Sequence, residues 1–301
     1  MTQPRFSVVT TCLNQQNTIE RTICSVIDQT CDDFELIVVD RGSTDNSLQL
    51  VDLYEDDLTL INAPTSSKAQ ALNLGVARAT GEFIAFVDDM LLPESLSIVS
   101  EHLTQAPKTQ WLVGDIWQLD ENDLESGLTT ACAPENLCAF LMHDAGLLPL
   151  ASTFIKRDIL NDFGTLDTNY KHAFDFELAS RLLTSGMTPT VIHKPLTTCW
   201  QKTAGLAADQ TLHQGLEQIS IARRYGHKLP IKQRYEVWKN CEQRQRIYAL
   251  AETELHPDLA RKQLWQKLLR HPWWIMNETV RDRLVHGVSH PAPSELDRIA
   301  A

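Results

Sequence analysis

The first hundred residues alternate four times between a short apolar run and a segment with helical spacing. The apolar runs are rich in β-branched and aromatic residues and cover residues 6–11, 34–40, 58–62 and 83–88. Between the first two runs, residues 18–29 place apolar residues at i, i+4, i+7 and i+8, and the later intervening segments are also expected to be helical. This alternation predicts βαβ units and a mainly parallel central sheet with helices on its faces.

The character of the sequence changes near residue 209. Before it, further strands are expected at 111–117, 149–155 and 188–200, with helices at 156–164 and 172–186. After it, nearly the whole chain has helical spacing. We therefore predict two domains, an α/β domain over residues 1–208 and an α-helical C-terminal extension over residues 209–301.

Charge divides in the same way and limits the partners. Residues 1–210 hold 12 Lys and Arg against 29 Asp and Glu, a balance of −17, whereas residues 211–301 hold 15 against 10, a balance of +5. An acidic body argues against nucleic acid as a partner. The basic, aromatic segment 261–274 fits either a peripheral contact with an anionic membrane surface or a contact with another subunit.

The lack of a recognisable targeting signal and the pattern of cysteines favour a cytoplasmic location. No apolar stretch approaches the roughly 20 residues that cross a bilayer, and the first residues lack a basic leader followed by an apolar region. Seven scattered cysteines without a CxxC pair are expected to be reduced. The expected location is cytoplasmic, with peripheral attachment at the inner membrane surface as an open alternative.

Two aspartates stand where predicted strands end. Asp40 closes the second strand and is followed by Gly42 and Ser43 in a turn, and Asp88 closes the fourth strand and is followed by Asp89. The carboxyl ends of parallel strands meet at one edge of a sheet, where α/β proteins bind their ligands. A single strand-end aspartate is usually a turn residue, but the pair predicts a ligand site.

Four ordered motifs across roughly residues 5–205 resemble the family 2 glycosyltransferases, which have the GT-A fold. The motifs are "SVVTTCLNQQNTIERTICSVIDQT", "FELIVVDRGSTDNS", "ALNLGVARATGEFIAFVDDMLLPESL" and "GTLDTNYKHAFDFELASRLLTSG". The resemblance implies a Rossmann-like sheet flanked by helices. It also implies transfer of a sugar from a nucleotide-sugar, linked to UDP, GDP or dTDP, onto a hydroxyl acceptor with inversion, in surface or lipid-linked glycan assembly.

The resemblance assigns roles residue by residue. Thr10 and Asp40 resemble residues that hold the base, with Arg41, Gly42 and Ser43 on the nucleotide-binding edge. Asp88 resembles the first aspartate of the DxD motif, which approaches the ribose and a Mn or Mg ion, and Asp89 is the second candidate metal ligand.

The acceptor side is assigned in the same way. Asp175 resembles the catalytic base that takes the proton of the acceptor hydroxyl. Glu177 is a nearby carboxylate that either raises the pKa of that base or contacts the acceptor.

Several positions depart from the family pattern. Leu13 replaces a base-stacking aromatic residue, Arg41 replaces the second Asp of "VDDGS", and Met90 stands where a metal-ligating aspartate belongs. Residues 201–203 replace a histidine of the metal shell. Methionine sulfur is a poor ligand for Mg or Mn, whereas Arg41 and Lys202 are cations that can neutralise a departing diphosphate instead.

Two functions remain open at this stage. The first is a glycosyltransferase whose partners are a nucleotide-sugar and a glycan or lipid-linked acceptor. The second is a non-catalytic GT-A-like binding or assembly protein that has lost metal-dependent donor binding. Asp40, Asp88, Asp89 and Asp175 favour the enzyme, and Leu13, Arg41 and Met90 favour the assembly protein.

Overall fold

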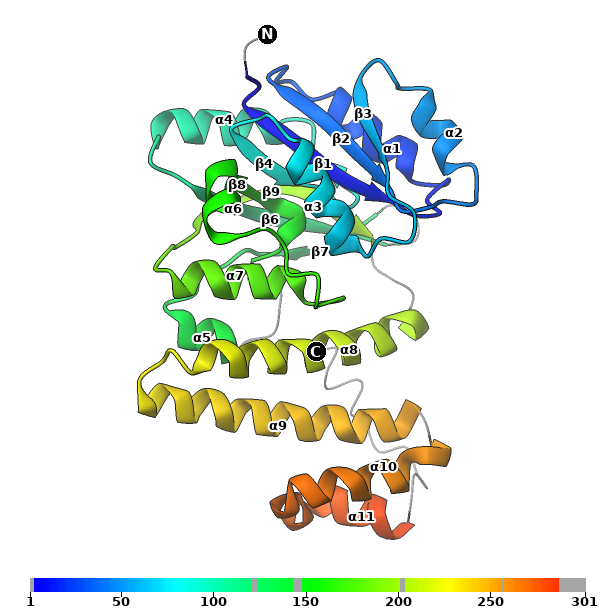
Figure 1. Cartoon of the computed structure of the whole chain (residues 1–301), viewed down its shortest axis with the longest axis vertical. Coiled ribbons are helices and arrows are strands. Elements are labelled where there is room, and N and C mark those ends of the chain that lie inside the picture. The colour runs from blue at the N-terminus through cyan, green and yellow to red at the C-terminus, as the bar shows by residue number, and fades with distance from the viewer. Residues whose placement is uncertain (1–2, 121–123, 143–147, 201–203, 256, 287–301) are drawn as a thin grey trace. The chain divides into compact units, whose positions relative to one another are not determined.

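The computed structural model describes residues 3–120, 124–142, 148–200, 204–255 and 257–286 (Figure 1). The chain divides into two compact units, Met1–Gln201 and Lys202–Ala301. The predicted domain boundary between residues 208 and 209 lies a few residues later, inside helix α8 (Ala204–Gly226). Within the part that the structure describes, no helix is both long enough and apolar enough to cross a membrane.

The N-terminal unit is built on one sheet, in which nine strands of the described residues take part. Four of them, β1 (Phe6–Cys12), β2 (Phe34–Asp40), β3 (Leu58–Asn62) and β4 (Phe83–Phe86), run parallel in the order β3-β2-β1-β4. These are the four strands that the alternation predicts. All four carboxyl ends therefore lie at one edge.

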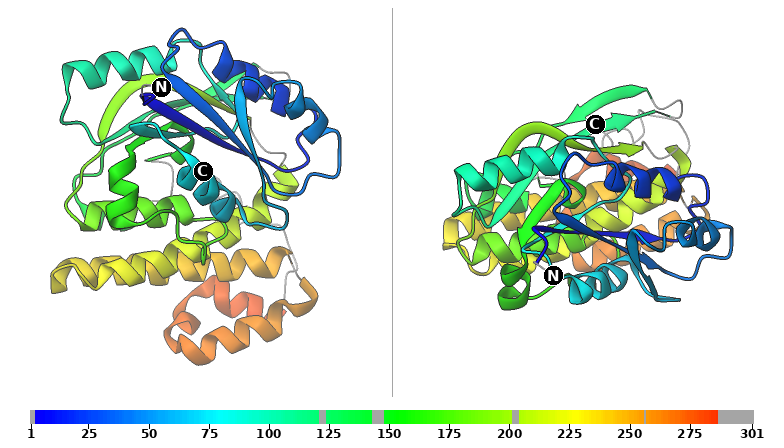
Figure 2. Two further views of the ribbon diagram at one scale, coloured as in Figure 1. Left: turned by 45° about the horizontal axis from the view of Figure 1, so that its top comes forward. Right: turned by 90° about the horizontal axis from the view of Figure 1, so that it is seen from above.

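Successive side chains of the buried strands point to opposite faces of the sheet, and helices cover each face. Even-numbered residues such as Val8 and Val38 pack in one core with α1 (Ile19–Ile27) and α4 (Ser95–Gln105). On the opposite side, Gly75 of α3 (Lys68–Arg78) sits so close to β1 that an added Cβ would lie 2.4 Å from Val9. The views from above and at 45° show helices on both faces of this sheet (Figure 2). The short helix α2 (Ser47–Asp52) follows β2.

The sheet continues past β4 with mixed strands. β8 (Thr153–Lys156) pairs antiparallel with β4 and with β6 (Trp111–Leu119), and β9 (Thr190–Trp200) pairs parallel with β6. Helices α6 (Arg157–Phe163) and α7 (Phe174–Thr184) follow β8. These elements agree with the sequence expectations to within a few residues.

Three short elements were not predicted. They are β5 (Met90–Leu91), β7 (Glu125–Thr129) and α5 (Leu137–Met142). Two residues are too few for a periodicity, and β7 lies in an acidic segment whose exposed residues lack an apolar alternation. Pairing with β9 and β6, respectively, gives β5 and β7 their strand conformation.

The C-terminal unit is helical, as expected. α8 and α9 (Ile231–Leu255) pack side by side, and α10 (Pro257–Arg270), the 3-10 helix η2 (Pro272–Met276) and α11 (Glu278–His286) follow (Figure 1). Gly215 allows the α8–α9 contact, because a Cβ there would lie 2.2 Å from the Tyr248 ring. A small core joins the later helices and consists of Ala249, Leu250, Leu264, Leu268, Trp274, Val280 and Leu284.

Candidate functional site

Asp40 builds the turn that follows β2. Its carboxylate accepts hydrogen bonds from the backbone N–H of Gly42 at 2.8 Å and of Ser43 at 3.1 Å, and its side chain is buried. Gly42 has φ 96°, a left-handed conformation that favours glycine. Asp40 therefore shapes the predicted nucleotide-binding edge, and its contact with a base stays a prediction.

The loop after β1 is fastened to this turn. The backbone N–H groups of Asn14 and Gln15 donate to the hydroxyls of Ser43 and Ser47, and the Asn14 side chain accepts from the Thr44 N–H at 2.8 Å. The first two loops thus form one rim at the carboxyl edge. Thr10 lies behind it, buried inside β1, and its Oγ1 has no hydrogen-bond partner among the described residues.

Arg41 extends the rim towards α3. Its Nε donates to the Ser66 carbonyl at 3.2 Å, and no ion pair is formed with an acidic side chain in the described part of the chain. Burial lowers the pKa of the guanidinium from its ordinary value, but arginine still keeps its proton. The predicted cation therefore lies beside the loop that leads into α3.

The start of α3 places Lys68 at the same edge. Ser67 caps the helix: its Oγ accepts from the Gln70 N–H, and the Gln70 side chain accepts from the Ser67 N–H. This capping box makes Lys68 the first residue of the helix. A cation there is unfavourable for the helix dipole, so local helix energetics do not explain its presence.

Lys68 pairs with the first aspartate of the predicted DxD segment. Its Nζ lies 2.6 Å from Asp88 Oδ1, and the two side chains are 34% and 42% exposed, so solvent and ligands reach both. Burial alone would lower the pKa of Lys68, but Asp88, Asp89 and Asp175 together raise it. Lys68 is therefore a fixed positive charge among three carboxylates.

Asp89 and Met90 hold the end of β9. Asp89 Oδ2 accepts a hydrogen bond from the Trp200 N–H at 3.0 Å, and Met90 pairs with Thr198 in the β5–β9 ladder. Burial raises the pKa of Asp89, and the Asp88 charge adds to the rise. Met90, the residue that departs from the DxD pattern, thus lies in a strand, and its backbone pairs with β9.

Asp175 joins this group from α7. It lies in the first turn of the helix and accepts from the Phe176 N–H at 2.7 Å. Burial raises the pKa of Asp175 to about 6, although Lys68 acts in the opposite direction. A carboxylate with this pKa is a stronger base than an ordinary aspartate and is still ionised at neutral pH.

Glu177 faces a different environment. It is 1% exposed and forms an ion pair with Arg181 at 2.8 Å, and Arg181 also donates to the carbonyls of Phe163 and Thr165. These contacts tie α7 to the loop after α6. The suggested role of Glu177 at the acceptor stays a prediction, and Lys202, the predicted diphosphate contact, lies outside the described residues.

Asn73 joins α3 to the loop that leads into α7. Its amide donates to the Leu166 carbonyl at 2.8 Å and accepts from the Leu166 N–H at 2.9 Å. Asn73→Ala should lower the free energy of unfolding by about 2 kcal/mol, because two backbone groups lose their partner. Urea unfolding measures this. Asn169→Ala in the same loop is the control, since within the described ranges that exposed side chain hydrogen-bonds to Asp167 alone, and an equal loss in both variants would contradict the assignment.

The donor set does not fit a divalent cation. Asp88 is held by an ammonium and Asp89 by a backbone N–H, and the third position of the motif is a thioether. The residues that the structure describes contain no group of three or more His, Cys, Asp or Glu side chains that could hold a metal. At Asp88 and Asp89, the predicted metal ligands, the local positive charge is Lys68.

Sequence reasoning missed Lys68. The available signal was a lysine directly after a helix cap at the carboxyl edge of the sheet, where the helix dipole disfavours it. A residue that contradicts local helix preference is often retained for function. The pairing itself joins α3 to the end of β4 and needed the fold.

Known proteins resemble this chain at two levels. Residues 7–111 match the model of Glycosyl transferase family 2. A PGL/p-HBAD biosynthesis glycosyltransferase of Mycobacterium bovis is 24% identical over 241 residues, which cover 77% of this chain and 90% of the relative. An uncharacterized glycosyltransferase of Nostoc is 34% identical over 122 residues, 38% of this chain and 37% of the relative.

Solved structures share the fold. S. aureus TarS 1-349 in complex with UDP-GlcNAc matches with a TM-score of 0.55 and 16% identity, over 89% of this chain and 92% of the 1-349 chain. The mannosyltransferase PcManGT of Pyrobaculum calidifontis, in complex with GDP-Man and Mn2+, matches with a TM-score of 0.53 and 18% identity, over 100% of this chain and 87% of PcManGT. Residues 7–111 thus match the Glycosyl transferase family 2 model, and the sheet shares the GT-A fold of solved glycosyltransferases.

Proposed function

We propose that this enzyme transfers a sugar from a nucleotide-sugar to a hydroxyl of a glycan or lipid-linked acceptor, with inversion and with Lys68 in place of a metal ion. The observation that carries the proposal is the 2.6 Å pair between Lys68 and Asp88, with Asp89 and Asp175 close enough to shift the pKa of Lys68. The similar protein named as a PGL/p-HBAD biosynthesis glycosyltransferase supports glycosyl transfer as the reaction.

The chemistry assigns one task to each charge. The acceptor oxygen attacks the anomeric carbon, the bond from that carbon to the diphosphate breaks, and the nucleoside diphosphate leaves with the electron pair. Asp175 takes the proton of the acceptor hydroxyl. The Lys68 ammonium neutralises charge that develops on the diphosphate, the task that a cation performs in phosphate chemistry.

The pH dependence follows from Asp175. Since its pKa is raised to about 6, Asp175 becomes protonated as the pH falls through 6 and can no longer accept a proton. We expect kcat/KM to be level above this value and to fall roughly tenfold per pH unit below it. Initial rates across the pH range measure the profile. A rate unchanged through pH 6 would show that Asp175 is not the base.

A donor panel tests the function itself. Purified protein is incubated with UDP-, GDP- and dTDP-sugars, and release of the nucleoside diphosphate is followed with and without simple glycan or glycolipid acceptors. We expect release from at least one donor, and its loss in Asp175→Asn. If no donor binds or turns over, the alternative of a GT-A-like assembly protein is correct instead.

A further inference from the structure

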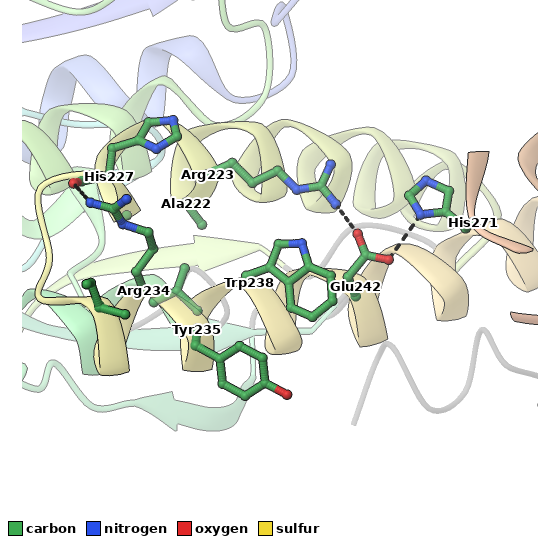
Figure 3. A pocket seen from close by; sticks show the side chains of 11 residues that line it. Ala222, Arg223, His227, Arg234, Tyr235, Trp238, Glu242 and His271 are labelled. Atoms are coloured by element: carbon green, nitrogen blue, oxygen red, sulfur yellow. Dashed lines mark hydrogen bonds and ion pairs between the residues drawn. The ribbon is translucent and has the colours of Figure 1, made fainter. Parts of the chain in front are cut away.

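A cavity of about 680 Å³ lies in the C-terminal unit, between α8 and the first half of α9 (Figure 3). This volume is typical of small-molecule sites. The walls that matter here are basic or aromatic side chains from α8, the turn after it, α9 and the start of η2: Arg223, His227, Arg234, Tyr235, Trp238 and His271.

One rim of the cavity is an apolar stripe on α9. Ile231, Tyr235 and Trp238 recur at i, i+4 and i+7 and so share one face of the helix. They are 83%, 58% and 44% exposed, and the rings of Tyr235 and Trp238 stack with their centroids 5.9 Å apart. Three large apolar side chains in a row on an exposed face indicate an interaction surface.

The surface around this cavity is strongly basic. Residues 221–240 contain six lysines and arginines and one glutamate, a formal charge of +5. Arg223 is neutralised by Glu242, whereas Lys228, Lys232 and Lys239 are exposed and form no ion pair within the described ranges. The N-terminus of α9 adds its own partial positive charge.

We propose that this surface docks on a bilayer that contains anionic phospholipids, with a lipid phosphate in the cavity beside Arg234 and His227. Tyr and Trp are favoured at the boundary between headgroups and acyl chains. Lysines beside them can extend to the phosphates while their stems stay on apolar surface. This surface combines exposed aromatic side chains and lysines around one cavity.

A second copy of the chain fits the surface less well. In a two-fold dimer the same patch lies on both partners, so two clusters of +5 would face each other. A membrane that carries negative charge has the opposite sign. The inference does not depend on the proposed transfer reaction, because lipid binding is measured without any donor.

A rival surface within the unit provides the matched control. Trp265 and Leu269 of α10 are also exposed, in the segment 261–274 that the sequence marked as a membrane candidate. Lys267 in that segment is already paired with Glu252. The two surfaces can be separated by substituting exposed residues of one and then of the other, which leaves both cores intact.

The test is cosedimentation of the full-length protein with vesicles of phosphatidylcholine alone or mixed with phosphatidylglycerol. We expect binding to the mixed vesicles only, decreasing as salt rises. Lys228→Glu with Lys232→Glu should weaken it by at least about 25-fold, and Ile231→Ser with Trp238→Ser should weaken it strongly as well. Lys262→Glu with Trp265→Ser should bind like the wild type.

Several results would overturn the proposal. These are equal binding to neutral vesicles, no binding by the wild-type protein, or loss of binding only in the α10 variant. Sedimentation velocity without lipid is the remaining check: if the α9 substitutions dissociate an oligomer of the wild-type protein and leave vesicle binding unchanged, the surface is a subunit interface.

Discussion

Asp175→Asn should lower the transfer rate by about a thousandfold, within the range that a general base contributes. The amide keeps the size and the position at the start of α7 but cannot accept the proton of the acceptor hydroxyl. Nucleotide affinity should change less than about twofold, because the proton is transferred on the acceptor side. Transfer kinetics and nucleotide titration, made on the same preparation, separate the two quantities.

The matched control for this variant is Asp158→Asn. Asp158 lies in the first turn of α6 as Asp175 lies in that of α7, so both substitutions remove a similar interaction with a helix dipole. Asp158 is exposed and outside the charge cluster, and its variant should transfer at the wild-type rate. Near-normal transfer by Asp175→Asn would refute the base assignment.

Asp175→Asn also has a testable effect on the free energy of unfolding. Burial raises the pKa of Asp175 above its ordinary value of 3.8 to about 6, so the folded protein holds this proton more tightly than the unfolded chain. The free energy of unfolding therefore falls as the pH rises from 3.8 to about 6, and it stays at the lower value above that pH. Asp175→Asn removes that reduction, and loss of activity in a protein at least as stable as the wild type excludes unfolding as its cause.

Lys68→Ala should lower transfer by about a hundredfold or more, the range seen when one group that stabilises developing negative charge is removed. It should also weaken binding of the nucleoside diphosphate. Lys68→Arg should recover part of the activity, because it restores the charge with a different shape. Since Lys68 lowers the pKa of Asp175, the acid limb of the pH profile should shift to higher pH in Lys68→Ala.

Lys156→Ala is the control for this prediction. Lys156 forms an ion pair of the same kind with Glu82, and the exposed fractions, 33% and 49%, are close to those of Lys68 and Asp88. Exposed pairs of this kind contribute at most about 1 kcal/mol to stability. Equal effects of the two variants on transfer would mean that Lys68 acts only through stability.

The sequence predicted the fold well in the segments whose apolar residues follow a regular strand or helix spacing. The four parallel strands, α1, α3 and α7 follow directly from apolar spacing. β5 could not be predicted, because its two residues form a strand only through pairing with β9. The same pairing explains Met90, which looks like a lost metal ligand in the sequence and is a strand residue in the structure.

The sequence points to candidate site residues but not to their contacts. Asp40 and Asp88 are candidates because each ends a predicted strand, and Asp175 is a candidate through the family resemblance. Two of the contacts are local: Asp40 accepts hydrogen bonds from its own turn, and Glu177 pairs with Arg181 one helical turn away. The pair between Asp88 and Lys68 joins separate elements of the fold and leaves no periodic trace in the sequence.

Calorimetric titration of UDP, GDP and dTDP, once with a chelator and once with Mn2+, tests whether Lys68 takes the place of a metal ion. If Lys68 replaces the metal, the preferred nucleotide binds equally well under both conditions, and Lys68→Ala weakens binding under both. Binding that requires Mn2+ and survives Lys68→Ala would show that a metal ion, and not Lys68, holds the diphosphate.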